Sequence, residues 1–162
     1  MIQRIQSLFL LLAAVLAVVV VFLPIGTVAL NEYAEYAFSA FTLKAYKPGG
    51  EIGAPVMHTT YIAVLWFASA ILSLVTIFMY KNRQLQVRLN GINMLIMLAA
   101  LVVMLYVYPN LVFAHQAWYQ EGMDVVFNRW ILLALVPAVC LYLANWAIKR
   151  DEKKVRAADC LR

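Results

Sequence analysis

The sequence predicts an all-α fold, a four-helix bundle embedded in a membrane, and three observations point to it. Of the 162 residues, 65% are hydrophobic and 13% are charged, whereas soluble domains are roughly half apolar and a quarter charged. The apolar residues gather in four blocks without Asp, Glu, Lys, Arg or His, each about 20 residues long and able to cross a hydrocarbon core of about 30 Å. The basic residues, finally, are divided unevenly between the ends of these blocks.

The blocks define a single domain over residues 1–162. Transmembrane helices are expected over residues 7–29, 58–80, 89–108 and 127–150. Between and after them lie outer loops (30–57 and 109–126), a short basic turn (81–88) and a helical tail (149–162). We expect the first helix to be retained rather than cleaved, because its apolar run is longer than the roughly 7 to 15 residues of a signal peptide.

The basic residues set the orientation, because Lys and Arg accumulate in cytoplasmic segments. With the turn 81–88 inside, both termini are cytoplasmic, and of the 13 basic residues only Lys44, Lys47 and Arg129 lie outside. This asymmetry accounts for the basic pI of 9.3 without nucleic-acid binding. The side chains expected to fix the topology or to bind anionic lipid headgroups are Arg4, Lys81, Arg83, Arg88, Lys149, Arg150, Lys153 and Lys154.

The first outer loop is the longest polar interval. A short helix is expected over Leu30 to Ala37, followed by a small hairpin about the turn Pro48-Gly49-Gly50. The aromatic residues of this loop have two interpretations. They form an interfacial cap at headgroup level, which we favour, or an extracytoplasmic binding loop.

Prolines and a cap position predict where helices end or bend. Pro24 should bend or end the first helix, and Pro109 should end the third. Asp124 is the expected N-cap of the fourth helix, with residues 125–130 as its first turns. Pro137 then predicts a kink in the middle of that helix.

Small and polar residues inside the spans predict helix packing. Ser69 and Ser73, like Ala134 and Ala138, are four residues apart and allow close approach of another helix. The amide side chains of Asn93 and Asn145 are expected at the same depth near the cytoplasmic side. They form either a hydrogen bond with each other or separate bonds to water, lipid or their own helices. The full set of expected packing or polar contacts is Asn93, Asn145, Ser69, Ser73, Ala134, Ala138 and Pro137.

Both histidines fall on the outer side. His58 and His115, with Glu121 or Asp124, have the residue types of a metal or proton-handling site. Without a fixed ligand spacing we expect solvated interfacial histidines, and no metal or cofactor. The two cysteines, Cys140 within a span and Cys160 on the reducing side, predict no disulfide.

The termini and the inner turn carry a resemblance. The opening Met-Ile-Gln-Arg-Ile-Gln-Ser, the turn Tyr-Lys-Asn-Arg-Gln-Leu-Gln and the ending from Leu-Ala-Asn-Trp to Asp-Cys-Leu-Arg resemble the domain-of-unknown-function family 4293. The resemblance covers the whole chain and departs from the family at Cys160, where a basic residue is expected. It implies a multi-pass protein with four helices in the inner membrane of Bacteroidota. It implies no activity and no catalytic residue.

The function expected from these features is structural. Phosphate-binding, nucleophile-elbow, zinc-protease and Cys-x-x-Cys motifs are missing from the sequence. The four apolar blocks also lack the charged or histidine side chain that proton-coupled transporters bury within the membrane. We therefore expect no enzyme but an accessory subunit that assembles with another membrane protein. The alternatives are a small transporter, channel or intramembrane enzyme acting as a homo-oligomer, and an extracytoplasmic ligand sensor. The basic tail is either a docking helix or a topology anchor.

Overall fold

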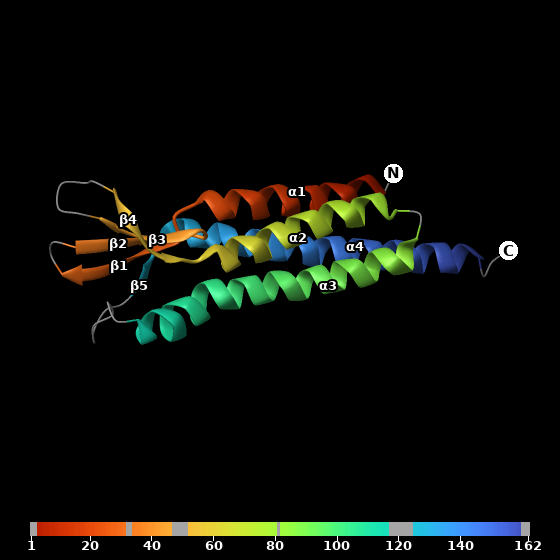
Figure 1. Ribbon diagram of the computed structural model, residues 1–162. Helices are drawn as coiled ribbons and strands as arrows, with labels where there is room; N and C mark the ends of the chain where they lie inside the picture. Colours follow the sequence, from red (N-terminus) through yellow and green to blue (C-terminus); the bar gives the residue numbers. More distant parts are fainter. Residues whose placement is uncertain (1–2, 32–33, 47–51, 81, 117–124, 160–162) are drawn as a thin grey trace.

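Four long helices run side by side, with a small sheet at one end (Figure 1). The computed structural model describes residues 3–31, 34–46, 52–80, 82–116 and 125–159. The start of α1 and the end of α4 lie at the end of the bundle opposite the sheet, and α4 projects beyond the other helices there. The long helices are α1 (Gln3–Phe22), α2 (Thr60–Phe78), α3 (Arg83–Val102) and α4 (Leu135–Asp159).

The four helical stretches are long and apolar enough to cross a membrane, at Ile5–Phe22, Thr60–Phe78, Arg83–His115 and Arg129–Asp151. Helix α1 packs against α2 and α4, and α3 packs against the same two helices. Small and apolar side chains such as Ala13, Ala17 and Met97 fill the centre. Large apolar side chains point outward from every helix, among them Leu8, Ile71, Leu95 and Tyr142. An exposed apolar surface of this extent suits lipid rather than water as the solvent.

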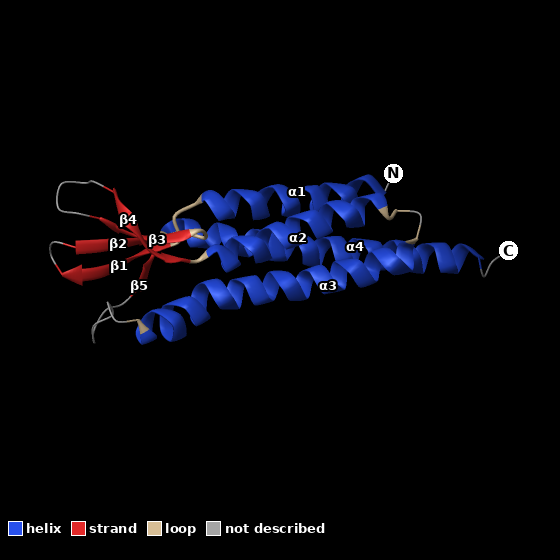
Figure 2. Cartoon of the chain, in the orientation of Figure 1, coloured by secondary structure: helices blue, strands red, loops and turns tan. Residues whose placement is uncertain are grey.

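The fold is not all-α as expected, because it also contains a small sheet. Its five strands are antiparallel in the order β4-β3-β2-β1-β5 (Figure 2). The expected hairpin is present, since β3 pairs with β4 on either side of residues 47–51, which lie outside the described residues. The expected helix over Leu30 to Ala37 is wrong, because the described residues of this segment, 30–31 and 34–37, belong to the paired strands β1 and β2. The strands are β1 (Gly26–Asn31), β2 (Ala34–Phe38), β3 (Thr42–Tyr46), β4 (Ile52–His58) and β5 (Val125–Phe127).

The two faces of the sheet differ, as the alternation of a strand requires. Val28, Phe38 and Leu43 lie on the inward face and are fully buried. Thr27, Glu35 and Lys44 lie on the outward face and are exposed. A one-sided apolar surface of this kind needs a cover.

The cover comes from an extension of α3. The helix continues as a π-helix, η1 (Val103–Val112), and a 3-10 turn, η2 (Phe113–His115). The ring of Phe38 lies 5.0 Å from that of Phe113 in an edge-to-face arrangement and 6.1 Å from that of Tyr108. Burial of these rings against the sheet stabilises the whole extension.

The extension corrects the expected end of the third helix at Pro109. In an α-helix the proline ring crowds the carbonyl four residues back, and its missing N–H breaks a bond. A π-helix, whose bonds reach five residues back, passes the proline with a wider turn. The outer loop predicted from residue 109 therefore starts as helix.

Helix α1 ends at Phe22, just ahead of Pro24, as expected from this proline, so the expected range 7–29 is too long and residues 26–29 form β1. The start of the fourth helix differs from expectation. Residues 125–127 form β5, so the predicted helix start there is wrong. Asn128 is the actual cap, since its Oδ1 accepts a bond from the Trp130 N–H at 3.4 Å. Asp124 lies outside the described residues.

A 3-10 segment, η3 (Arg129–Ala134), leads into α4. The chain changes to α geometry at Leu135, two residues before Pro137, so Pro137 lies in the first turn of α4. A proline is tolerated in a first turn, because the N–H groups there lack helical partners. The irregularity expected at Pro137 is thus a change of helix type.

Candidate functional site

Nine polar residues, eight of them buried and Asn145 half-buried, form a cluster in the half of the bundle away from the sheet, and we call this cluster the polar core. Each of the four helices contributes to it. Polar groups inside an apolar bundle are costly unless they are hydrogen-bonded, so their partners decide what the cluster does. The polar core consists of Gln6 from α1, Ser69, Ser73 and Thr76 from α2, Gln86, Asn90 and Asn93 from α3, and Asn145 and Asp151 from α4.

Asn93 is the centre of the contact between α2 and α3. Its Oδ1 accepts a bond from Ser69 Oγ at 2.7 Å, and its Nδ2 donates to Ser73 Oγ at 2.7 Å. Ser73 Oγ donates in turn to the Ser69 carbonyl at 2.9 Å. All three side chains are almost completely buried. One amide therefore joins two successive turns of the neighbouring helix.

A second contact joins the same helices closer to the turn between them. Gln86 Nε2 donates to the Thr76 carbonyl at 3.3 Å, while Thr76 Oγ1 bonds the Leu72 carbonyl at 2.7 Å. Asn82 caps α3 at this end, its Oδ1 accepting from the Leu85 N–H at 3.2 Å. Side chains of α3 thus bond α2 at three successive positions, Ser69, Ser73 and Thr76.

The remaining polar bonds reach α4. Asn90 Nδ2 donates to the Leu141 carbonyl at 3.0 Å and joins α3 to α4. Gln6 Nε2 donates to Asp151 Oδ2 at 2.8 Å and to the Ala147 carbonyl at 3.3 Å, which joins α1 to α4. Asp151 is only 9% exposed and is the ionisable member of the polar core. Side-chain hydrogen bonds therefore join α1 to α4, α2 to α3 and α3 to α4.

Three polar atoms beside the polar core lack a protein partner in the described part of the chain. They are Asn90 Oδ1, Asn145 Oδ1 and Arg83 Nη1. Asn90 bonds α4 at Leu141, one helical turn from Asn145, so the two amide oxygens belong to the same contact between α3 and α4. A buried acceptor without a donor costs about 1 to 3 kcal/mol.

The predicted pairing of Asn93 with Asn145 is not formed. Asn93 faces α2, and Asn90, three residues earlier and about 60° away around the helix, faces α4. The small residues of the expected packing faces also point into this chain. Ser69 and Ser73 bond Asn93, Ala134 is buried, and Ala138 is partly buried against the core.

The sequence matches the family DUF4293, a domain of unknown function, over residues 2–161. The chain belongs to the DUF4293 family. Comparison with curated proteins finds no match. Membership of DUF4293 brings no assigned activity to the polar core, so its role has to be argued from its geometry.

The outer histidines do not meet in a site within the described residues. His58 is exposed in β4, and His115 is exposed at the end of η2, with its Nδ1 2.7 Å from the Leu111 carbonyl. Glu121, like Asp124, lies outside the described residues. Among the residues that are described, no three metal-ligating side chains gather.

The basic residues expected as anchors have different surroundings. Arg88, Lys149 and Arg150 are exposed, and the guanidinium of Arg150 lies 5.2 Å above the Trp146 ring. Arg83 is half-buried, with the unpartnered Nη1 described above. The side chains of Arg4, Lys153 and Lys154, and all of Lys81, lie outside what the structure describes.

Sequence reasoning missed part of the polar core. Gln6, Gln86, Asn90 and Asp151 were not singled out. The signal was present in α3, where residues 86, 90 and 93 are spaced by four and three and so share one helix face. For Gln6 and Asp151 no local signal exists, because only the packing of α1 on α4 brings residues from the two ends of the chain together.

Proposed function

We propose that the protein is a multi-pass inner-membrane protein with cytoplasmic termini and serves as a structural or accessory subunit of a larger membrane complex. The observation that carries this proposal is the polar core, whose hydrogen bonds run between the protein's own helices. Such bonds fix the register and rotation of the helices and support a rigid frame.

The charges at the two ends of the bundle support the orientation. Arg88, Lys149 and Arg150 are exposed at the end away from the sheet. Lys44 and Arg129 lie at the sheet end. With the positive-inside bias, the sheet is the extracytoplasmic part.

A groove between α1 and α2 is the surface we assign to the partner. It encloses about 270 Å³, with Ala14 and Ala70 in its floor and Val15 and Leu74 among its walls. The small-residue pairs expected to meet a partner are used inside the chain, whereas this groove faces outward. Its lining is apolar at mid-helix depth, so the occupant that fits is a transmembrane helix of another protein, which small residues let approach closely.

Purification from native membranes in mild detergent tests the proposal. We expect a second membrane protein at constant stoichiometry, and we expect Val15→Trp, at a groove residue that is 51% exposed, to lower its yield. Val64→Trp on α2, outside the groove and 57% exposed, is the matched control. A pure homo-oligomer with a hydrated central path contradicts the accessory role.

That contrary result would favour a transporter. The observation behind this second candidate is the set of unpartnered atoms at Asn90, Asn145 and Arg83, which are the groups a permeating polar solute would contact. Solute flux into liposomes that is lost in Asn90→Leu would support it. If the unmodified protein gives no solute flux, the transporter function is ruled out.

A further inference from the structure

A second feature of the molecule lies at the opposite end of the bundle from the polar core. A cavity of about 350 Å³ opens where β1, β2 and β5 meet the start of η3. This volume is in the range of small-ligand sites, about 300 to 1,000 Å³. Its lining combines polar and apolar side chains, among them Thr27, Glu35, Asn128, Ala37, Val126 and Phe127.

The sheet register places the polar groups together. Thr27 pairs with Ala37 of β2 on one side and with Val126 of β5 on the other, so these three side chains share the outward face. Glu35, two residues before Ala37, lies on that face and is the ionisable group of the described lining. The cavity therefore offers one carboxylate, a hydroxyl and an amide beside the apolar side chain of Val126.

A positive charge stands next to the cavity on the same face. Lys44 pairs directly with Ala37, which makes it the diagonal neighbour of Glu35 on the adjoining strand. Diagonal neighbours in an antiparallel pair are about 7 to 8 Å apart. A ligand that carries a cationic and an anionic group close together matches this pair of charges.

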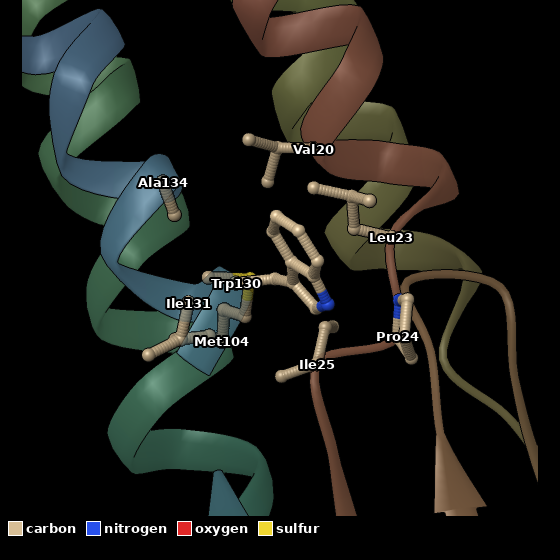
Figure 3. Close-up of a pocket in the computed structure, with 8 residues that line it drawn as sticks. All are labelled: Val20, Leu23, Pro24, Ile25, Met104, Trp130, Ile131 and Ala134. Atoms are coloured by element: carbon tan, nitrogen blue, oxygen red, sulfur yellow. The ribbon is translucent and has the colours of Figure 1, made fainter. Parts of the chain in front are cut away.

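The position along the bundle suggests where such a ligand comes from. Figure 3 shows the Trp130 indole lying over the chain at Pro24 and Ile25, where α1 gives way to β1. Trp130 is 58% exposed, and a tryptophan at the end of a spanning helix is typical of the headgroup level. Pro24 also lines the cavity, so the cavity opens at that same level.

We propose that this cavity binds the primary ammonium group of a zwitterionic phospholipid headgroup in the outer leaflet. The leaflet assignment rests on the orientation given under the proposed function. The ammonium donates to the Glu35 carboxylate and the Thr27 hydroxyl, and the phosphate lies toward Lys44. A choline headgroup has no N–H to donate, so an ethanolamine headgroup binds more tightly.

Native mass spectrometry of the purified full chain tests this site. The protein is incubated in detergent with equal amounts of phosphatidylethanolamine and phosphatidylcholine that have the same acyl chains. We expect about threefold more ethanolamine lipid than choline lipid on the unmodified protein, as an exposed charge-assisted contact allows. Glu35→Gln should bring the ratio to about one, whereas Glu35→Asp retains part of the preference.

His58→Gln is the matched control, because His58 is exposed in β4 at the opposite edge of the sheet. It should leave the lipid ratio unchanged. An unmodified protein without preference, or a preference that survives Glu35→Gln, overturns the site. A parallel titration with free ethanolamine separates the two sources of an ammonium group, since complete displacement of the lipid at millimolar amine overturns the lipid assignment.

The outcome is distinguishable from that of the proposed function. Lipid preference is measured on the isolated protein in detergent and needs neither a partner nor an oriented membrane. Loss of the partner in the purification experiment therefore leaves the ammonium site standing, and loss of lipid preference leaves the accessory role standing.

Discussion

Replacing Asn93 by leucine is the sharpest test of the idea that the polar core holds the bundle together. Leucine has the same number of side-chain heavy atoms as asparagine and the same branch at Cγ, so the substitution removes polarity and keeps the shape of the side chain, although its methyl groups are bulkier. It deletes the bonds to Ser69 and Ser73, both 2.7 Å long and fully buried. It also leaves Ser69 Oγ without its acceptor, although Ser73 keeps the Ser69 carbonyl.

The magnitude follows from the two lost bonds. Side-chain hydrogen bonds between membrane helices contribute about 0.6 kcal/mol on average and at most about 1.7 kcal/mol. We therefore expect Asn93→Leu to lower the free energy of unfolding by about 1 to 2 kcal/mol. A double-mutant cycle with Ser69→Ala should give a coupling energy of about 0.6 kcal/mol, because the two side chains bond each other.

Reversible unfolding in mixed detergent or bicelles measures these energies. Asn110→Leu is the matched control, because Asn110 is exposed on the same helical stretch and its side chain bonds the Tyr106 carbonyl of its own helix, one turn earlier, at 3.2 Å. An Asn93 variant no less stable than the Asn110 variant, or a cycle with zero coupling, would refute the reasoning.

Two further predictions concern the strand junction and the contact between the terminal helices. A Cβ at Gly26 would lie 2.6 Å from the Val126 carbonyl oxygen, so Gly26→Ala should separate β1 from β5, cost about 1 to 3 kcal/mol and speed hydrogen exchange of the β5 amides. Gly91→Ala, with nothing within 4 Å, should instead stabilise α3 by about 0.5 to 1 kcal/mol, and equal effects at the two glycines would contradict this account. Asp151→Leu removes the 2.8 Å bond from Gln6 and should lower the free energy of unfolding by about 1 to 3 kcal/mol, measured by the same unfolding assay. Asp151→Asn keeps an acceptor oxygen and should cost less, and a leucine variant as stable as the asparagine variant would show that the bond contributes nothing.

The helices could be predicted because their signal is local. An apolar block without charges has one stable arrangement in lipid, and the four blocks gave all four helices. Their ends were less accurate where tertiary packing decides. Pro109 should stop a helix by local rules, yet burial of Tyr108 and Phe113 on Phe38 holds the chain in a helical path.

The sheet was predicted only in part. The turn sequence Pro48-Gly49-Gly50 predicted one hairpin. Strand β5, in contrast, pairs with β1, which lies about a hundred residues earlier in the sequence. The sequence of β5 does not predict this pairing, because its three residues are too few to show the alternation of a strand. The outward face that carries Glu35 and Lys44 was missed for the same reason, since it exists only once β1, β2 and β3 are in register.

The polar core shows the same division between local and distant information. The spacing of Gln86, Asn90 and Asn93 predicts that they lie on the same side of α3. Which neighbour each one meets depends on helix rotation, and a difference of three residues turned Asn90 to α4 and Asn93 to α2. Pairing by depth alone, as for Asn93 and Asn145, ignores this rotation.

The most direct test of the central claim is the accessibility of the two ends of the bundle in intact cells. In a background without Cys140 and Cys160, single cysteines replace Lys44 in β3 and Asn82 at the start of α3, both exposed. A membrane-impermeant maleimide should label Lys44→Cys in spheroplasts and should label Asn82→Cys only after permeabilisation. Labelling of Asn82→Cys in intact spheroplasts would contradict a four-helix membrane protein that keeps its basic ends in the cytoplasm.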